Sequence, residues 1–297
     1  MLDPARYGAA RLADFRAGAL GALGNARRLA SDFAGARSAF REAGGELGRG
    51  TGDPLEEAVL LSLRASLHKD LGEFERAMEI LDQAAAIYRE ANEPHLEGRS
   101  RIKQAATIGF TDPETAVKLA QNGLALIDAR REPRLEMCGR HALSHFLNDA
   151  GHSREALAML EISRPLYAQF EEPWTRIRLH WLEGKLARSL GDLAEAEEIL
   201  KRLWFDLQDP ASAHELTLVS LDLAEVYVAR GKHEEALELV EEFVPLLQGW
   251  GMHAEGLALW LLMQKAVRER RAESALFRQM AEYISRAWYR PIRSQEN

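Results

Sequence analysis

Apolar residues recur along the chain with a helical period, and short turns interrupt the apolar segments at regular intervals. An alanine occupies the same place in six successive segments, at steps of 41, 39, 40, 40 and 40 residues. A small residue at such a position lets two helices approach closely. The pattern predicts antiparallel helix pairs that repeat about every 40 residues, and the alanines are Ala36, Ala77, Ala116, Ala156, Ala196 and Ala236.

An acidic residue followed by proline marks the start of most of these pairs, and the prolines step by 40, 39, 40 and 37 residues. Proline suits the first position of a helix, and a carboxylate just before it interacts favourably with the unpaired N–H groups of the first turn. Each such dipeptide therefore predicts a helix start. The five are Asp53-Pro54, Glu93-Pro94, Glu132-Pro133, Glu172-Pro173 and Asp209-Pro210.

Within most pairs a second, short turn separates the two helices, and four of these turns contain glycine, which suits a helix C-terminus. The turns are Ser31-Asp32-Phe33, Leu71-Gly72-Glu73-Phe74, Ala150-Gly151-His152, Leu190-Gly191-Asp192-Leu193 and Arg230-Gly231-Lys232-His233. With the alanine three positions beyond the aromatic or leucine, the arrangement resembles tetratricopeptide repeats. Their signature is Leu-Gly in the first helix, Gly-x-aromatic at the turn, and then small, large and small positions in the second helix.

The first, second, fifth and sixth units match this signature well. The first carries Leu23, Gly24, Phe33, Ala36, Phe40 and Ala43. The fourth unit is intermediate. The third departs from the pattern, because Thr111-Asp112-Pro113 stands at its turn and Gly123 at its last small position, so we expect a distorted hairpin there.

The resemblance implies an all-α fold, a right-handed α-solenoid of antiparallel helix pairs, with a unit longer than the 34 residues typical of the family. Long-period arrays of this kind resemble those of bacterial signalling and regulatory proteins. We expect a single domain over residues 1–297, with divergent capping helices at about 253–289 that break near Arg270-Arg271. The expected repeats span residues 12–50, 54–92, 94–131, 133–171, 173–208 and 212–249.

Composition narrows the function. Hydrophobic residues make up 46% and charged residues 28% of the chain, which is typical of a folded protein, and the net charge of −8 disfavours nucleic acid. The single cysteine, Cys138, predicts a reducing, cytoplasmic location. The longest apolar stretch, residues 257–263, is too short to span a membrane, and the first residues have no signal-peptide pattern. Because helical patterning begins almost at once, we also expect a segment of a longer polypeptide.

The sequence contains no phosphate loop, nucleophile elbow or HExxH motif, so we expect neither an enzyme nor a cofactor. The glycine-rich stretch 48–52 lacks the lysine of a phosphate loop and is interpreted as an inter-repeat loop. Cys138, His141 and His145 lie along one helical stripe with Asp149 a turn further, a geometry in which zinc is conceivable. A structural zinc site normally takes four ligands, frequently from two elements, so we expect no metal.

The resemblance also implies a partner-binding groove lined by the first helix of each pair. The transferred positions are basic and polar, which favours an acidic peptide or a C-terminal carboxylate, with Trp181 as an anchor. The alternative is that these side chains form a merely solvated inner face. They are Asn25, Arg28, Ser66, Lys69, Arg101, His141, His145, Asn148, Arg178, Trp181, Lys185 and Arg188.

Two functions thus stand side by side. The first is a protein- or peptide-binding scaffold, adaptor or sensor module. The second is a structural element that self-assembles into a homo-oligomer through a terminal apolar face, comprising Trp260, Met263, Phe277 and Trp288. Catalysis is the third and weakest hypothesis, because no catalytic constellation is present.

Overall fold

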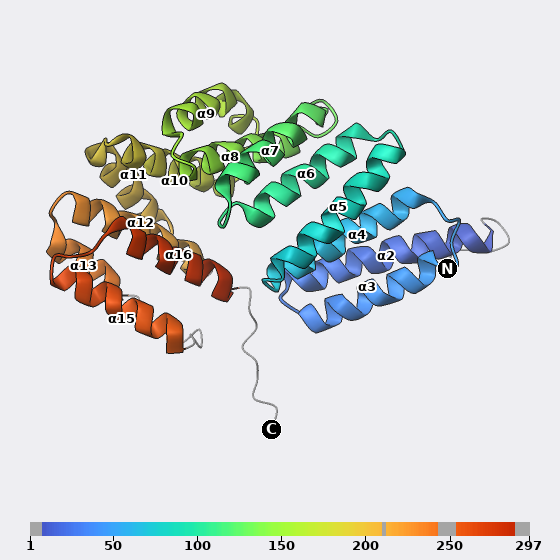
Figure 1. Ribbon diagram of the computed structural model, residues 1–297, viewed down its shortest axis with the longest axis horizontal. Helices are drawn as coiled ribbons and strands as arrows, with labels where there is room; N and C mark the ends of the chain where they lie inside the picture. The colour runs from blue at the N-terminus through green and yellow to red at the C-terminus, as the bar shows by residue number, and fades with distance from the viewer. Residues whose placement is uncertain (1–7, 210–211, 243–253, 289–297) are drawn as a thin grey trace. The chain divides into compact units, whose positions relative to one another are not determined.

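The computed structural model describes residues 8–209, 212–242 and 254–288, and over these ranges it contains fourteen α-helices and no strand (Figure 1). The all-α prediction is confirmed. Residues 8–149 form α2 (Ala9–Leu29), α3 (Phe33–Leu47), α4 (Pro54–Asp70), α5 (Phe74–Glu90), α6 (Pro94–Ile108), α7 (Pro113–Leu126) and α8 (Pro133–Asp149). The later helices are α9 (Ser153–Tyr167), α10 (Pro173–Leu190), α11 (Leu193–Asp206), α12 (Ala213–Ala229), α13 (His233–Glu242), α15 (Ala254–Arg268) and α16 (Ser274–Trp288).

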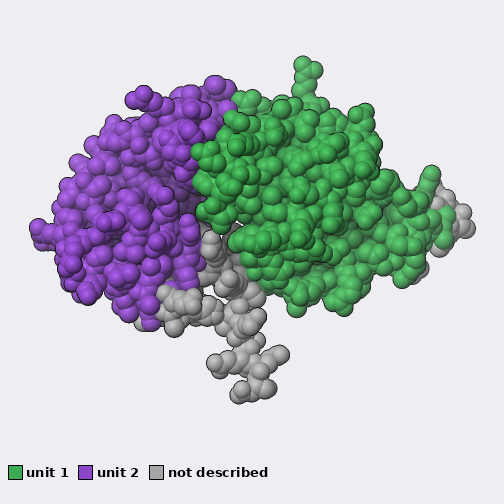
Figure 2. All heavy atoms as spheres, in the orientation of Figure 1, with its two compact units in different colours: residues 1–146 green, residues 147–297 purple. Residues whose placement is uncertain are grey.

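The chain divides into two compact units, residues 1–146 and residues 147–297, which Figure 2 colours separately. In unit 1, α2 packs on α3, α4 on α5 and α6 on α7; in unit 2, α10 packs on α11, α12 on α13 and α15 on α16. We call the first helix of each pair the A helix and the second the B helix. The expectation of a single domain over residues 1–297, with the repeat bounds given above, stays a prediction.

The helices begin at the positions that the acidic residue–proline dipeptides predicted. Proline is the first residue of α4, α6, α8 and α10, and also of α7. At α4 the Asp53 side chain also accepts a hydrogen bond from the Leu55 N–H at 2.9 Å, which satisfies one unpaired donor of the first turn. Pro210 lies outside the described residues, and the helix that follows it, α12, is described from Ala213.

Outside the α6–α7 pair, the turns inside the pairs reverse the chain through a residue in the left-handed region. Gly72, Gly151, Gly191 and Gly231 occupy these positions with φ between 75° and 90°. Other residue types take the same conformation where glycine is missing, as Ser31 does at 61°. The turn between α15 and α16 uses Arg270 at 57°, so the break predicted near Arg270-Arg271 is a hairpin of the same kind.

The six equivalent alanines are fully buried at 0% exposure, as expected for contacts between helices that lie close together. The α6–α7 pair approaches even more closely, through two glycines. A Cβ on Gly98 would lie 2.6 Å from the backbone oxygen of Gly123, and a Cβ on Gly123 would lie 2.8 Å from that of Gly98. The turn of this pair, residues 109–112, also differs from the others because it has no residue in the left-handed region, and the two helices meet backbone to backbone.

Three of the four terminal apolar residues are buried. The exposed fractions are 1% for Trp260, 0% for Met263 and 2% for Phe277, because these side chains of α15 and α16 pack in the hydrophobic core of unit 2. The side chain of Trp288 lies outside the described residues. The predicted self-assembly face is thus wrong for the three described residues. No helix in the described part of the chain is both long enough and apolar enough to cross a membrane.

Candidate partner-binding face

The A helices of unit 1 bring together basic side chains from separate repeats. Arg28, near the end of α2, forms an ion pair with Asp70 at the end of α4. Its Nε also donates to the Oδ1 of Asn25 at 3.1 Å, so a predicted polar neighbour orients the guanidinium. The Arg28 and Asp70 side chains are 16% and 12% exposed, which makes this pair a link between successive A helices.

Lys69 lies beside that pair on α4 and is partly buried. Burial lowers the pKa of its ammonium group; the charge of Asp70 raises this pKa and that of Arg28 lowers it further. Asp70, however, already serves as the acceptor for Arg28. Among the described residues, no hydrogen bond or ion pair joins Lys69 to a carboxylate.

Lys103 reaches the same region from α6. Its Nζ donates to the backbone carbonyl of Ser62 on α4 at 3.2 Å, and a carbonyl is a neutral acceptor. Burial lowers the pKa of Lys103 to about 8, and the neighbouring cations Arg99, Arg28 and Lys69 lower it further. The charges that act most strongly on Lys103 are therefore all positive.

Arg99 lies one turn before Lys103 on α6 and forms an ion pair with Glu132. The same carboxylate lies 3.2 Å from Nε2 of the buried His95, whose Nδ1 accepts the backbone N–H of Asp128 at 3.0 Å. With Nδ1 accepting this N–H, Nε2 is the ring nitrogen that donates to Glu132. We name Arg28, Lys69, Arg99 and Lys103 the cationic cluster; two of its members have carboxylate partners and two have none among the described residues.

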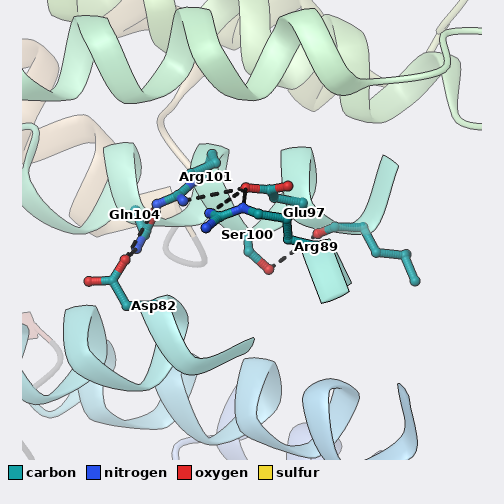
Figure 3. Close-up of polar contacts among 7 residues, drawn as sticks. Asp82, Arg89, Glu97, Ser100, Arg101 and Gln104 are labelled. Atoms are coloured by element: carbon teal, nitrogen blue, oxygen red, sulfur yellow. Dashed lines mark hydrogen bonds and ion pairs between the residues drawn. The ribbon is translucent and has the colours of Figure 1, made fainter. Parts of the chain in front are cut away.

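Arg101, which the sequence analysis placed in the groove, contacts Gln104, Asp82 and Glu97 rather than residues of the cationic cluster. In Figure 3 the Arg101 side chain lies beside Gln104 and Glu97. Its guanidinium is 3.0 Å from Oε1 of Gln104 and 3.4 Å from carboxylate oxygens of both Asp82 and Glu97. Arg89 also binds Glu97, at 2.7 Å. Arg101 thus belongs to a polar network that fixes two helices to each other.

The other predicted residues of unit 1 lie outside the cationic cluster. Ser66 donates its hydroxyl to the Ser62 carbonyl at 3.1 Å, one turn back on the same helix. His141 and His145 are on α8, both partly buried, and the His145 ring lies edge-on to Phe146 at 6.2 Å between centroids. In the described residues, no group of three or more histidine, cysteine and acidic side chains could hold a metal ion.

In unit 2 the predicted A-helix residues meet carboxylates of the following A helix. Trp181 Nε1 donates to Oδ2 of Asp222 at 2.7 Å, and an Arg188 Nη donates to the other Asp222 oxygen at 3.1 Å. Arg188 also forms an ion pair with Glu225, and all three charged side chains are only 14% to 20% exposed. Although burial lowers the pKa of Arg188, these carboxylates raise it overall.

Lys185 completes this arrangement, which we call the unit 2 ion network: Trp181, Lys185 and Arg188 with Asp222 and Glu225. The Lys185 Nζ lies 3.9 Å from Asp222 and 5.7 Å from the centre of the Trp181 ring. Trp181, the predicted anchor for a partner, is instead partly buried and hydrogen-bonded within the chain. The network connects α10 to α12.

Two further predicted residues of unit 2 have other surroundings. The exposed Arg178 lies over the Trp174 ring, 5.5 Å from its centre. Asn148 is 8% exposed, and its Oδ1 accepts the Ser153 hydroxyl at 2.9 Å, which ties the end of α8 to the start of α9. Asn148 therefore contributes to the turn rather than to an open face.

The glycine-rich stretch 48–52 is the loop between α3 and α4. Both the N–H and the hydroxyl of Thr51 donate to the carboxylate of Asp14, the hydroxyl at 2.7 Å. A hollow of about 330 Å³ beside it is lined by Asp14, Asp53 and Glu57 as well as Arg64. A negatively charged group where a phosphate would have to bind argues against a phosphate cradle.

These features define a helical repeat protein whose A helices carry buried and half-buried polar groups. Residues 58–95, from α4 to the start of α6, match the family model described as tetratricopeptide repeat. The predicted resemblance to tetratricopeptide repeats is confirmed.

Solved structures agree on the fold. A Rap protein complexed with Competence and Sporulation Factor is 13% identical, with a TM-score of 0.61 over 93% of this chain and 88% of that one. A structure of nearly identical TPR-like repeats from a putative kinesin light chain of Podosopora anserina is 20% identical. Its TM-score is 0.50 over 65% of this chain and 95% of that one. No curated protein matches the sequence.

Proposed function

We propose that this chain is a non-catalytic, cytoplasmic binding module that holds an acidic segment of a partner protein against the A helices of unit 1. The observation that carries the proposal is the position of Lys69 and Lys103. Two ammonium groups on adjacent A helices lie in one region, and among the described residues neither has a carboxylate partner.

The free-energy cost of burying the two ammonium groups supports the proposed binding of an acidic segment. Partial burial of an unpaired ammonium group costs free energy, and the lowered pKa values of both lysines express that cost. A carboxylate from a partner would offset it by forming charge-assisted hydrogen bonds. The cationic cluster is thus better suited to a complex than to the isolated chain.

The fold is compatible with such a role. Tetratricopeptide-type repeats present a surface built from many helices and carry no catalytic chemistry of their own. The Rap protein with this fold is complexed with Competence and Sporulation Factor, which supports a binding role for this chain. The unit 2 ion network is less suitable for an acidic segment, because Asp222 and Glu225 already neutralise its cations.

The proposal is tested with three labelled peptide pools of equal length and hydrophobicity, one rich in Asp and Glu, one uncharged and one rich in Lys and Arg. Fluorescence anisotropy with the full chain should show tightest binding of the acidic pool, and this binding should weaken at high salt. The charge reversals Lys69→Glu and Lys103→Glu together should reduce the affinity at least about tenfold.

A matched variant reverses two exposed lysines on B helices, Lys118→Glu and Lys201→Glu, and should retain most of the affinity. Circular dichroism establishes that all variants keep their helices. Equal affinity for the three pools, or equal weakening by both double variants, would show that the cationic cluster is not a site for acidic segments.

A further inference from the structure

We infer that the cationic cluster binds a group carrying two negative charges, namely the phosphate of a phosphorylated residue in the partner segment. This inference rests on the proposed function and names the chemical group that the site of unit 1 recognises.

The first argument is a balance of charges. The four cations of the cluster face two carboxylates, Asp70 on Arg28 and Glu132 on Arg99. The cluster therefore carries two more positive than negative charges, and neither Lys69 nor Lys103 forms an ion pair with a carboxylate among the described residues. A single carboxylate would compensate one of them, whereas a phosphate monoester carries a charge of about −1.5 to −2 at pH 7 and would compensate both.

The second argument concerns geometry. A carboxylate is held best by the planar fork of an arginine, but both arginines of the cluster are already paired with carboxylates. The groups that remain are ammonium groups, each a compact charge with three donors that can point in different directions. Such donors suit the tetrahedral oxygens of a phosphate better than the plane of a carboxylate.

The third argument is that these ammonium groups approach from two different helices. Lys69 is on α4, and Lys103 extends from α6 to the Ser62 carbonyl of α4. Donors that converge from two helices can contact different oxygens of one phosphate group.

The test uses the full chain and three labelled acidic peptide pools that differ only in a fixed central residue, which is phosphoserine, serine or glutamate. Anisotropy should give an affinity for the phosphoserine pool at least about tenfold above that for the serine pool, with the glutamate pool between them. The double variant with Lys69→Gln and Lys103→Gln should lose this preference. The double variant with Lys118→Gln and Lys201→Gln loses the same charge at exposed positions and should keep it.

The dependence on pH provides a readout specific to a dianion. A phosphate monoester loses its second proton near pH 6, so the preference for phosphoserine over glutamate should increase from pH 5.5 to pH 7. It should decrease above about pH 8, where Lys103 loses its proton. Other titratable or charged groups also face this region: Arg28, Asp70, Arg99, Glu132, His95 and Tyr88. Because these groups act on both pools, the ratio of the two affinities reports the effect of the phosphate group.

The outcomes separate this inference from the proposed function. If the phosphoserine and serine pools bind equally and the double lysine variant binds both more weakly, the phosphate inference is wrong, whereas the proposed binding of an acidic segment still holds. A phosphoserine preference that survives the Lys69 and Lys103 substitutions would place the phosphate elsewhere. Binding of phenyl phosphate alone as tight as that of the phosphoserine pool would identify a free phosphate compound as the ligand, and no binding of any pool would overturn both proposals.

Discussion

Two A-helix cations, Arg188 of unit 2 and Lys103 of unit 1, have opposite surroundings. In unit 2, Arg188 meets Asp222 and Glu225 of the next A helix, and the charges stabilise the contact between repeats. In unit 1, Lys103 meets a neutral carbonyl oxygen and three other cations. The comparison shows that a basic residue on an A helix is not by itself evidence for a ligand. What distinguishes a binding group from a structural one is whether the chain supplies its own counter-charge.

The largest effect is expected from breaking the unit 2 ion network. Asp222→Ala removes the acceptor of Trp181 and one carboxylate of Arg188, and leaves partly buried donors unpaired. Removing one partner of a buried ion pair costs roughly 3 kcal/mol. Urea unfolding followed by circular dichroism should show this loss.

An exposed ion pair of the same unit serves as the control. Glu198 pairs with Arg202 at 2.8 Å, and the two side chains are 73% and 70% exposed. Glu198→Ala should lower the free energy of unfolding by less than about 1 kcal/mol, because solvent screens such pairs. Similar losses for the two variants would mean that the unit 2 ion network contributes no more than surface charge.

Removing a charge from the cationic cluster of unit 1 should raise the free energy of unfolding rather than lower it. Lys103→Met removes a partly buried charge that has no carboxylate partner and keeps most of the apolar side chain. We expect the free energy of unfolding at pH 7 to rise by roughly 1 kcal/mol, while affinity for acidic segments falls. Lys118→Met, at an exposed position of α7, should leave both quantities nearly unchanged.

The pH dependence of stability gives an independent check with a defined sign. Because the folded-state pKa of Lys103, about 8, lies below its ordinary value of 10.5, the folded chain loses this proton before the unfolded chain does. The unfolded state then binds more protons between about pH 8 and pH 10.5, so this residue contributes stability that increases with pH in that window. The Lys103→Met variant should lack this contribution, and an identical pH profile for both proteins would contradict the interpretation.

Much of the fold could be predicted because its signals are local and repeated. Proline at a helix start, a left-handed residue at a turn and alanine at a contact each act within a few residues, and each recurs about every 40 positions. The α6–α7 pair was the exception. Its close approach depends on Gly98 and Gly123 meeting across two helices, a contact that no local pattern reveals.

The site could be predicted only in part, because a face of a helix is sensitive to small errors in register. Of the four residues in the proposed cationic cluster, the sequence analysis named Arg28 and Lys69; on α6 it named Arg101 rather than Arg99 or Lys103. Two residues along an α-helix correspond to a rotation of about 200°, which moves a side chain to the opposite side. The hydrogen bond from Lys103 to Ser62, 41 positions earlier, is the pairing that fixes the register.

The counter-charges of unit 2 were also missed, although a sequence signal exists. Asp222 lies 41 positions after Trp181, close to the 42 positions that separate Asp70 from Arg28. Searching for carboxylates 41 or 42 positions beyond the A-helix residues would have found these two pairs, but not the contacts of Arg188 with Asp222 and Glu225, which are 34 and 37 positions away.

The smallest effect, and the most direct test of the comparison, comes from removing a counter-charge in unit 1. Glu132→Gln keeps the shape of the side chain and an oxygen that can accept from Arg99 and His95, but it raises the positive charge of the cationic cluster by one. The stability cost should stay below about 1 kcal/mol, since Glu132 is 36% exposed. Affinity for the acidic pool should rise by roughly twofold to threefold at moderate salt and less at high salt.

Glu197→Gln is the matched change in unit 2, where Glu197 pairs with Arg230 at 2.6 Å and Lys232 at 2.7 Å. It alters the net charge of the whole chain equally, so any general attraction of an acidic peptide would increase in both variants. A gain confined to Glu132→Gln would locate the partner's negative charge at unit 1. An equal gain in the two variants would show that the uncompensated lysines of unit 1 attract the partner no more than the rest of the molecular surface does.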